Sequence, residues 1–157
     1  MKRVAGLITI AAAFAATTAA VAVHPPARGQ AGTATLTMQI TNVRNANGVI
    51  RVDVCTEAEF LKKCRIFADA KAETGTTMVT IENVPFGVYG VSITHDENKN
   101  GKVDRGLFGL PKEGIGFSND APIRMGPPSW SDARIEFTGP KTISMKMRYF
   151  MGPSGPR

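Results

Sequence analysis

The stretch ATLTMQIT, residues 34–41, alternates apolar and polar side chains along its whole length. Successive side chains of a β-strand point to opposite faces, so this pattern predicts a strand with one buried face. The turn signal NANG follows at residues 45–48, and IRVDV at residues 50–54 alternates again. We therefore expect a second strand that returns along the first as a hairpin.

Further alternation along the chain extends this pattern. It recurs in residues 77–84, 88–93 and 142–149, and residues 134–138 are compatible with another strand. The segment TEAEFLKK, residues 56–63, predicts a brief helix, with Thr56 as its cap and Glu59 at the capping-box position. Short strands, turn signals and little helix predict an all-β fold, an antiparallel β-sandwich of about seven strands.

The N-terminus predicts export. Lys2 and Arg3 precede an apolar run without charge, and residues 20–22 read AVA, so residues 1–22 form a predicted signal peptide. A second cleavage position follows Ala31, and an uncleaved membrane anchor is the alternative. We expect a flexible lead-in over residues 23–32, one β-sandwich domain over 33–150 and a disordered tail over 151–157. The predicted location is periplasmic or secreted.

The charge of the chain gives little reason to expect nucleic-acid binding. The net charge is +6, and it falls to +4 when Lys2 and Arg3 leave with the signal peptide. No basic run is interleaved with aromatic residues, as a nucleic-acid surface would require. Contact with a membrane is expected only through an uncleaved signal peptide.

The two cysteines, Cys55 and Cys64, predict a disulfide. Exported proteins meet an oxidising compartment, and this pair would close a loop of ten residues, counting both ends. Nine positions of spacing with no histidine nearby do not favour a thiolate metal site. A redox-active pair would be closer in sequence.

The longest polar connection, HDENKNGKVDRGLFGLPKEGIGFSN at residues 95–119, follows an apolar strand. It contains the pattern D-x-N-x-N-G-x-x-D, in which alternate side-chain oxygens of a turning backbone reach one centre. The twelfth position is Leu107, where an EF-hand carries a bidentate Glu, so Glu113 or Glu97 would have to replace it. The candidate calcium ligands are Asp96, Asn98, Asn100, the carbonyl of Lys102, and Asp104.

A metal-free loop explains the same residues. Asp and Asn side chains form local turns with the backbone, and Asn100-Gly101 is a tight-turn pair. Only two carboxylates belong to the pattern, so any calcium affinity should be weak, with a Kd of roughly 10⁻⁴ to 10⁻³ M. Both interpretations, an ordered loop without metal and a weak calcium loop, stay open at this stage.

Three segments together resemble a known family. VPFGVY at residues 84–89, HDENKNGKVD at 95–104 and GLPKEGIGFSN at 109–119 are similar to the exported bacterial family called domain of unknown function 2141. The resemblance implies a transthyretin-like or immunoglobulin-like β-sandwich and no established activity. The Pro-x-Gly-x-Tyr turn is also similar to turns of carboxypeptidase-regulatory-like domains. Cys55 and Cys64 are not part of the motif.

Three classes of function follow. The favoured one is a non-enzymatic binding module, whose partner would be a cell-envelope component or a protein. An enzyme or enzyme accessory is the second class, and it would use His95, Glu113 and Ser118 around a cleft. The third class is a structural envelope protein without a ligand. No catalytic residue or cofactor other than calcium is predicted.

Overall fold

The structure is a computed structural model that describes residues 32–156. The predicted signal peptide and residues 23–31 of the predicted lead-in lie outside the described residues. Within the described part of the chain, no helix is long and apolar enough to cross a membrane.

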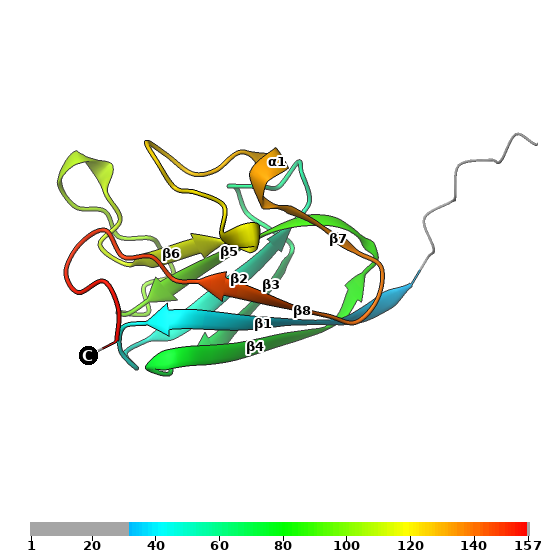
Figure 1. Cartoon of the computed structure of the whole chain (residues 1–157), viewed down its shortest axis with the longest axis horizontal. Coiled ribbons are helices and arrows are strands. Elements are labelled where there is room, and N and C mark those ends of the chain that lie inside the picture. Colours follow the sequence, from blue (N-terminus) through cyan, green and yellow to red (C-terminus); the bar gives the residue numbers. More distant parts are fainter. Residues whose placement is uncertain (1–31, 157) are drawn as a thin grey trace, which may run out of the picture.

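Within residues 32–156, eight strands form two sheets that pack face to face (Figure 1). One sheet has the order β4-β1-β8; the other has the order β3-β2-β5-β6, and β7 also pairs with β5. Three short helical segments interrupt the second half of the chain: η1 (Leu107–Gly109), η2 (Ser118–Asp120) and α1 (Trp130–Ala133). The strands are β1 (Thr33–Val43), β2 (Val49–Cys55), β3 (Ile66–Lys71), β4 (Gly75–Pro85), β5 (Gly87–Asp96), β6 (Gly114–Phe117), β7 (Arg134–Phe137) and β8 (Lys141–Lys146).

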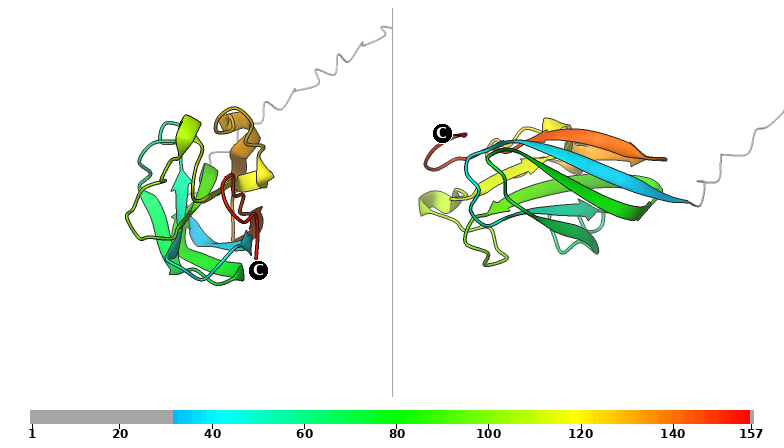
Figure 2. Two further views of the ribbon diagram at one scale, coloured as in Figure 1. Left: turned by 90° about the vertical axis from the view of Figure 1, so that its left-hand side faces the viewer. Right: turned by 90° about the horizontal axis from the view of Figure 1, so that it is seen from below.

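The core lies between the two sheets, which the right-hand view of Figure 2 shows as two layers. The alternation that predicted the first strand also predicts its buried side chains, because Leu36, Met38 and Ile40 are fully buried. Met145 and Met147 fill the same core at zero exposure, as expected for apolar side chains on one strand face. The predicted all-β sandwich is confirmed.

The predicted hairpin of the first two strands is wrong. β1 pairs with β4 and β8, whereas β2 pairs with β3 and β5, so residues 44–48 cross from one sheet to the other. A register shift between Thr41 and Val43, with Asn42 at φ 64°, bends β1 at its end. Alternation reveals which face of a strand is buried but not which strand lies beside it.

One strand pair departs from the antiparallel expectation. β8 runs parallel to β1, with Leu36 opposite Lys141 and Thr41 opposite Lys146, while the other named strand pairs are antiparallel. A parallel neighbour cannot be reached through a tight hairpin turn. Here the chain enters β8 from β7, which belongs to the other sheet. The connections before and after β6 project from the same side of the molecule (Figure 1).

The predicted helix over residues 56–63 is a turn. The capping contact forms, since Glu59 Oε2 accepts from the Thr56 amide at 3.1 Å and from the Thr56 hydroxyl at 2.8 Å. Leu61 then takes φ 61°, which ends the helical path after a single turn. Phe60 is buried and packs edge-on against Trp130, at 5.5 Å between ring centres.

Residues 151–156, predicted to form part of a disordered tail, lie against the end of β1. Asn42 Nδ2 donates to the Ser154 carbonyl at 2.8 Å, and Arg44 Nη1 donates to the Met151 carbonyl at 2.8 Å. These contacts place the C-terminal segment beside the polar connection that follows β5.

Candidate functional site

The polar half of the connection after β5, residues 97–104, is organised around Asp96, the last residue of β5. Its carboxylate is buried, and its two oxygens accept the backbone amides of Asn100 at 3.1 Å and Gly101 at 2.7 Å. Gly101 has φ 72°, a left-handed conformation that a side chain would strain. The acid at the first position of the predicted calcium pattern therefore holds the loop closed through its own backbone.

The other predicted ligands meet at Asp104. Asn98 Nδ2 donates to Asp104 at 2.7 Å, and Asn100 Nδ2 donates to both Asp104 oxygens at 3.0 and 3.1 Å. The side-chain oxygens of Asn98 and Asn100 accept the amides of Asn100 and Lys102 respectively. Lys102 takes part through this amide, which donates to the Asn100 side chain at 2.8 Å.

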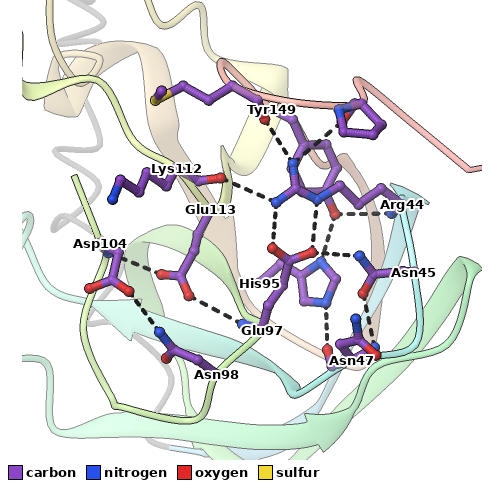
Figure 3. Close-up of polar contacts among 12 residues, drawn as sticks. Arg44, Asn45, Asn47, His95, Glu97, Asn98, Asp104, Lys112, Glu113 and Tyr149 are labelled. Carbon is purple, nitrogen blue, oxygen red and sulfur yellow. Dashed lines mark hydrogen bonds and ion pairs between the residues drawn. The ribbon is translucent and has the colours of Figure 1, made fainter. Parts of the chain in front are cut away.

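Glu113 returns to this loop from the far end of the connection. Its buried carboxylate accepts the Glu97 amide at 3.2 Å and the Asp104 amide at 3.0 Å, so it joins both ends of the polar half (Figure 3). Burial raises the pKa of Glu113, and the negative charges of Asp96 and Asp104 add to this effect. Glu113 therefore brings a third carboxylate to the predicted calcium pattern.

The described residues nevertheless do not form a closed metal cage. Within 32–156, no group of three or more His, Cys, Asp and Glu side chains is close enough to hold a metal ion. Asp104 Oδ2 already accepts two hydrogen bonds, whereas the side-chain oxygens of Asp96, Asn98 and Asn100 accept one each and keep a second lone-pair site for a cation. The arrangement is thus a self-braced loop that retains acceptor capacity for a calcium ion.

His95 lies beneath this loop in a chain of hydrogen bonds. Its ring is fully buried, with Nε2 2.8 Å from the Asn47 carbonyl and Nδ1 2.7 Å from the Tyr149 hydroxyl. The carbonyl can only accept, so Nε2 carries the proton and Nδ1 accepts from Tyr149, whose oxygen accepts the Arg44 amide at 3.0 Å. Burial lowers the pKa of His95 and raises that of Tyr149 to about 12.

Arg44 ties the remaining segments together. Its guanidinium forms a two-pronged ion pair with Glu97, and it lies 4.5 Å from the centre of the Tyr149 ring. Asn45 Nδ2 also donates to Glu97, at 2.6 Å. The bond from Arg44 is the largest cause that lowers the pKa of Glu97. Further donation to the carbonyls of Lys112 and Met151 makes Arg44 the shared contact of the loop, the tail and β1 (Figure 3).

The alternative set of His95, Glu113 and Ser118 is not assembled, because no two of these side chains share a hydrogen bond. Ser118 instead fills the gap between β6 and β7 along the edge of β5. Its Oγ accepts the Val91 amide at 2.9 Å and donates to the Ala133 carbonyl. Ser118 thus completes the backbone bonding of β5.

The two cysteines form the predicted disulfide, with 5.1 Å between their Cα atoms. The bridge closes the turn between β2 and β3 at its base. Cys55 and Cys64 are buried in a second, smaller apolar cluster with Phe60, Phe117 and Trp130. The disulfide therefore supports one end of the same sheet whose other end carries the polar loop.

The apolar half of the connection forms one wall of an open cleft of about 460 Å³. Leu110 and Pro111 of residues 105–111 line this wall together with Val103 just before them, and Ile123 and Met125 line the opposite wall. The floor is the outer face of the larger sheet, at the half-buried side chains of Asp53, Ser92 and Thr94. The backbone segments that carry these residues are the lime and the yellow-to-orange projections of Figure 1, and both rise on the same side in the left view of Figure 2.

Sequence reasoning predicted the carboxylates of the loop but not Arg44, Tyr149 or the cleft. Tyr149 falls on the apolar face of an alternating strand, and that pattern hides its polar contacts. The position of Arg44, just before the predicted turn at residues 45–48, is only a weak indication of its role in the site. The cleft depends on two segments separated by β6 and η2, so no local pattern marks it.

The fold and the loop together define a β-sandwich that carries a braced polar connection at one end. The chain matches the model of the family described as uncharacterized protein conserved in bacteria, domain of unknown function 2141, over residues 38–144. It belongs to that family, as the resemblance implied. No curated protein and no solved structure matches the chain.

Proposed function

We propose that this protein is an exported, non-enzymatic binding module of the bacterial cell envelope, and that the open cleft is its binding surface. The observation that carries this proposal is the pair of apolar side chains at the two walls. Phe108 is 98% exposed, and Met125, on the opposite wall, is fully exposed. Apolar side chains exposed around one hollow are typical of interaction sites.

Two features support export. The first 22 residues have the charge and hydropathy pattern of a signal peptide. The Cys55–Cys64 disulfide favours an oxidising compartment, because cytosolic thiols are kept reduced. Fractionation of cells that express the chain with a C-terminal tag tests this part of the proposal. A tagged protein that retains residues 1–22 and stays in the cytosol would contradict it.

A paired-variant capture experiment tests the cleft. We expect the double variant Phe108→Ser/Met125→Ser to recover less of one defined envelope component than the wild type does. Met78→Ser/Val88→Ser is the matched control, since both of these apolar side chains are also exposed but do not line the cleft. Equal recovery by all three proteins, measured by mass spectrometry of proteins and extracted small molecules, would exclude the cleft as the binding surface.

A second candidate function is weak calcium binding by the loop, and the position of Glu113 favours it. Glu113 is one of the two acids that could replace Leu107 at the twelfth position of the pattern, and its carboxylate accepts the amide of Asp104 at 3.0 Å. Asp96, Asn98, Asn100, Asp104 and the Lys102 carbonyl would be the ligands. Calcium would then stiffen the polar half of the connection and, through it, the wall of the cleft.

Calorimetric titration with millimolar calcium measures this directly. We expect a Kd of roughly 10⁻⁴ to 10⁻³ M and a rise in thermal stability. Asp104→Asn should remove both signals, whereas Asp69→Asn, at an exposed site on β3, should keep them. If the wild type gives neither heat nor a thermal shift, the loop is braced without metal and the binding-module proposal is unaffected.

A further inference from the structure

The chemistry of the cleft specifies the class of ligand, and this step rests on the binding function proposed above. Its walls are apolar on both sides, and its volume of about 460 Å³ lies in the range of small-molecule sites. Met125 is unbranched and adaptable, and Phe108 offers a flat apolar surface. Such walls suit an apolar body without hydrogen-bonding groups.

The backbone of the floor has no room for a peptide strand. β5 pairs with β2 along one edge and with β6 and β7 along the other. β6 pairs with β5, and Ile115 exchanges two backbone bonds with Arg148 on its other side. A peptide could not add to the floor by main-chain pairing, so a ligand must be held by side chains.

The uncompensated charge at the cleft is positive. Arg105 lines one wall and Arg124 the other, and within residues 32–156 neither takes part in an ion pair. Arg105 donates one N–H to the Gly109 carbonyl at 2.9 Å, which leaves its other donors available. Asp53 in the floor is the one acidic residue among the lining residues that the structure describes, and it lies 3.4 Å from Arg51, which it shares with Asp69.

We infer that the cleft binds a small anionic amphiphile, a medium-length acyl chain with a carboxylate head group. The acyl chain lies between the apolar walls, and the carboxylate meets Arg105 and Arg124 at the rim. Guanidinium groups bind carboxylates through paired N–H donors, which gives this head group an advantage over a neutral or cationic one.

The test titrates the purified protein with dodecanoate below its micelle concentration. We expect one site per chain, and chemical-shift changes confined to amides around residues 103–111 and 123–127. Dodecyltrimethylammonium, which has the same chain length and the opposite charge, should bind at least tenfold more weakly. Equal binding of the two amphiphiles, or no binding of dodecanoate, would overturn the inference.

Charge-reversal variants locate the head group. Arg105→Glu/Arg124→Glu should weaken dodecanoate binding at least tenfold, whereas Arg134→Glu/Lys71→Glu, with the same net charge, should change it less than threefold. Dodecanoate that binds equally to both double variants would place it elsewhere and overturn the inference. If dodecanoate fails but Phe108→Ser/Met125→Ser still loses an envelope component, the binding module survives with another class of ligand.

Discussion

At the scale of single residues, the buried ring of His95 determines how the connection between β1 and β2 sits under the loop. Its Nδ1 accepts a hydrogen bond from the Tyr149 hydroxyl and its Nε2 donates one to the Asn47 carbonyl, so the neutral ring satisfies both nitrogens. Burial without a charged partner in hydrogen-bond contact lowers its pKa. The network is therefore built for a neutral imidazole.

This geometry predicts a loss of stability as the pH falls from 7 to 5. His95 of the unfolded chain takes up a proton near pH 6.5, whereas His95 of the folded chain does so only at lower pH. The contribution of His95 to the free energy of unfolding is therefore present above about pH 6.5 and is lost as the pH falls below it. His95→Gln should remove up to about 1.4 kcal/mol per pH unit of this slope. Urea unfolding at stepped pH values measures both proteins.

The comparison with His95→Gln isolates this residue from its neighbours. Burial raises the pKa of Glu113, so protonation of that carboxyl favours the folded state as the pH falls and acts in the opposite direction. The pKa of Glu97 is lowered, so its contribution is lost only further into acid. Identical slopes for the wild type and His95→Gln between pH 7 and 5 would contradict the assignment.

Arg44 is the second residue whose chemistry can be tested. Its planar guanidinium bonds Glu97 and the carbonyls of Lys112 and Met151 at once, a geometry that a lysine ammonium cannot reproduce. We expect Arg44→Lys to lower the free energy of unfolding by about 2 kcal/mol. Arg134→Lys at an exposed position is the control. A change below about 0.5 kcal/mol in denaturant unfolding would show that the charge alone suffices.

At the scale of elements, the connection between β5 and β6 has two different halves. Residues 97–104 are held by side-chain bonds to backbone amides, and Glu113 closes that half from the far end. Residues 105–111 carry exposed apolar side chains, among them Leu107 and Phe108. The polar half therefore holds the connection in place, and the apolar half exposes its side chains to solvent.

The disulfide offers a prediction at this scale. For a closed loop of ten residues, the chain-entropy model gives about 2.7 kcal/mol of stabilisation. We expect Cys55→Ser/Cys64→Ser to lose that amount in chemical unfolding, and the reduced wild type to lose the same. A reduced wild type that unfolds at the same denaturant concentration as the oxidised one would contradict it.

The elements show what the sequence can and cannot predict. Alternation located β1, β2, β4 and β5, and the four loop side chains were predicted together because they are near neighbours in the chain. The predicted partner of β1 was wrong, since the residues of β4 and β8 that pair with it lie at least 32 positions away in sequence, and no local pattern encodes that pairing. Arg44 and the cleft escaped prediction for the same reason.

At the scale of the whole molecule, the two sheets are joined directly where β6 meets the chain after β8. The amide of Ile115 donates to Arg148 at 3.0 Å, and the amide of Arg148 donates back at 2.9 Å. Asp120 of η2 supports the junction by accepting the Lys146 amide at 2.7 Å. This junction fixes the floor of the cleft relative to the smaller sheet.

The closeness of this junction depends on Gly116. A Cβ atom there would lie 2.7 Å from the backbone carbonyl oxygen of Lys146 and 3.0 Å from side-chain carbons of Ile93. Backbone cannot swing aside as a flexible side chain can, so β6 and β8 would have to separate. We expect Gly116→Ala to lower the free energy of unfolding by about 1–3 kcal/mol.

The control is Gly139→Ala, where an added Cβ would meet nothing within 4 Å. Gly116→Ala should also speed hydrogen exchange of the Ile115 and Arg148 amides, since their bonds join the two sheets. Gly139→Ala should leave both amides protected. If the two variants unfold within about 0.5 kcal/mol of each other, the sheets tolerate separation at this point. The floor of the cleft would then be adjustable, and its width would be set by the ligand rather than by the fold.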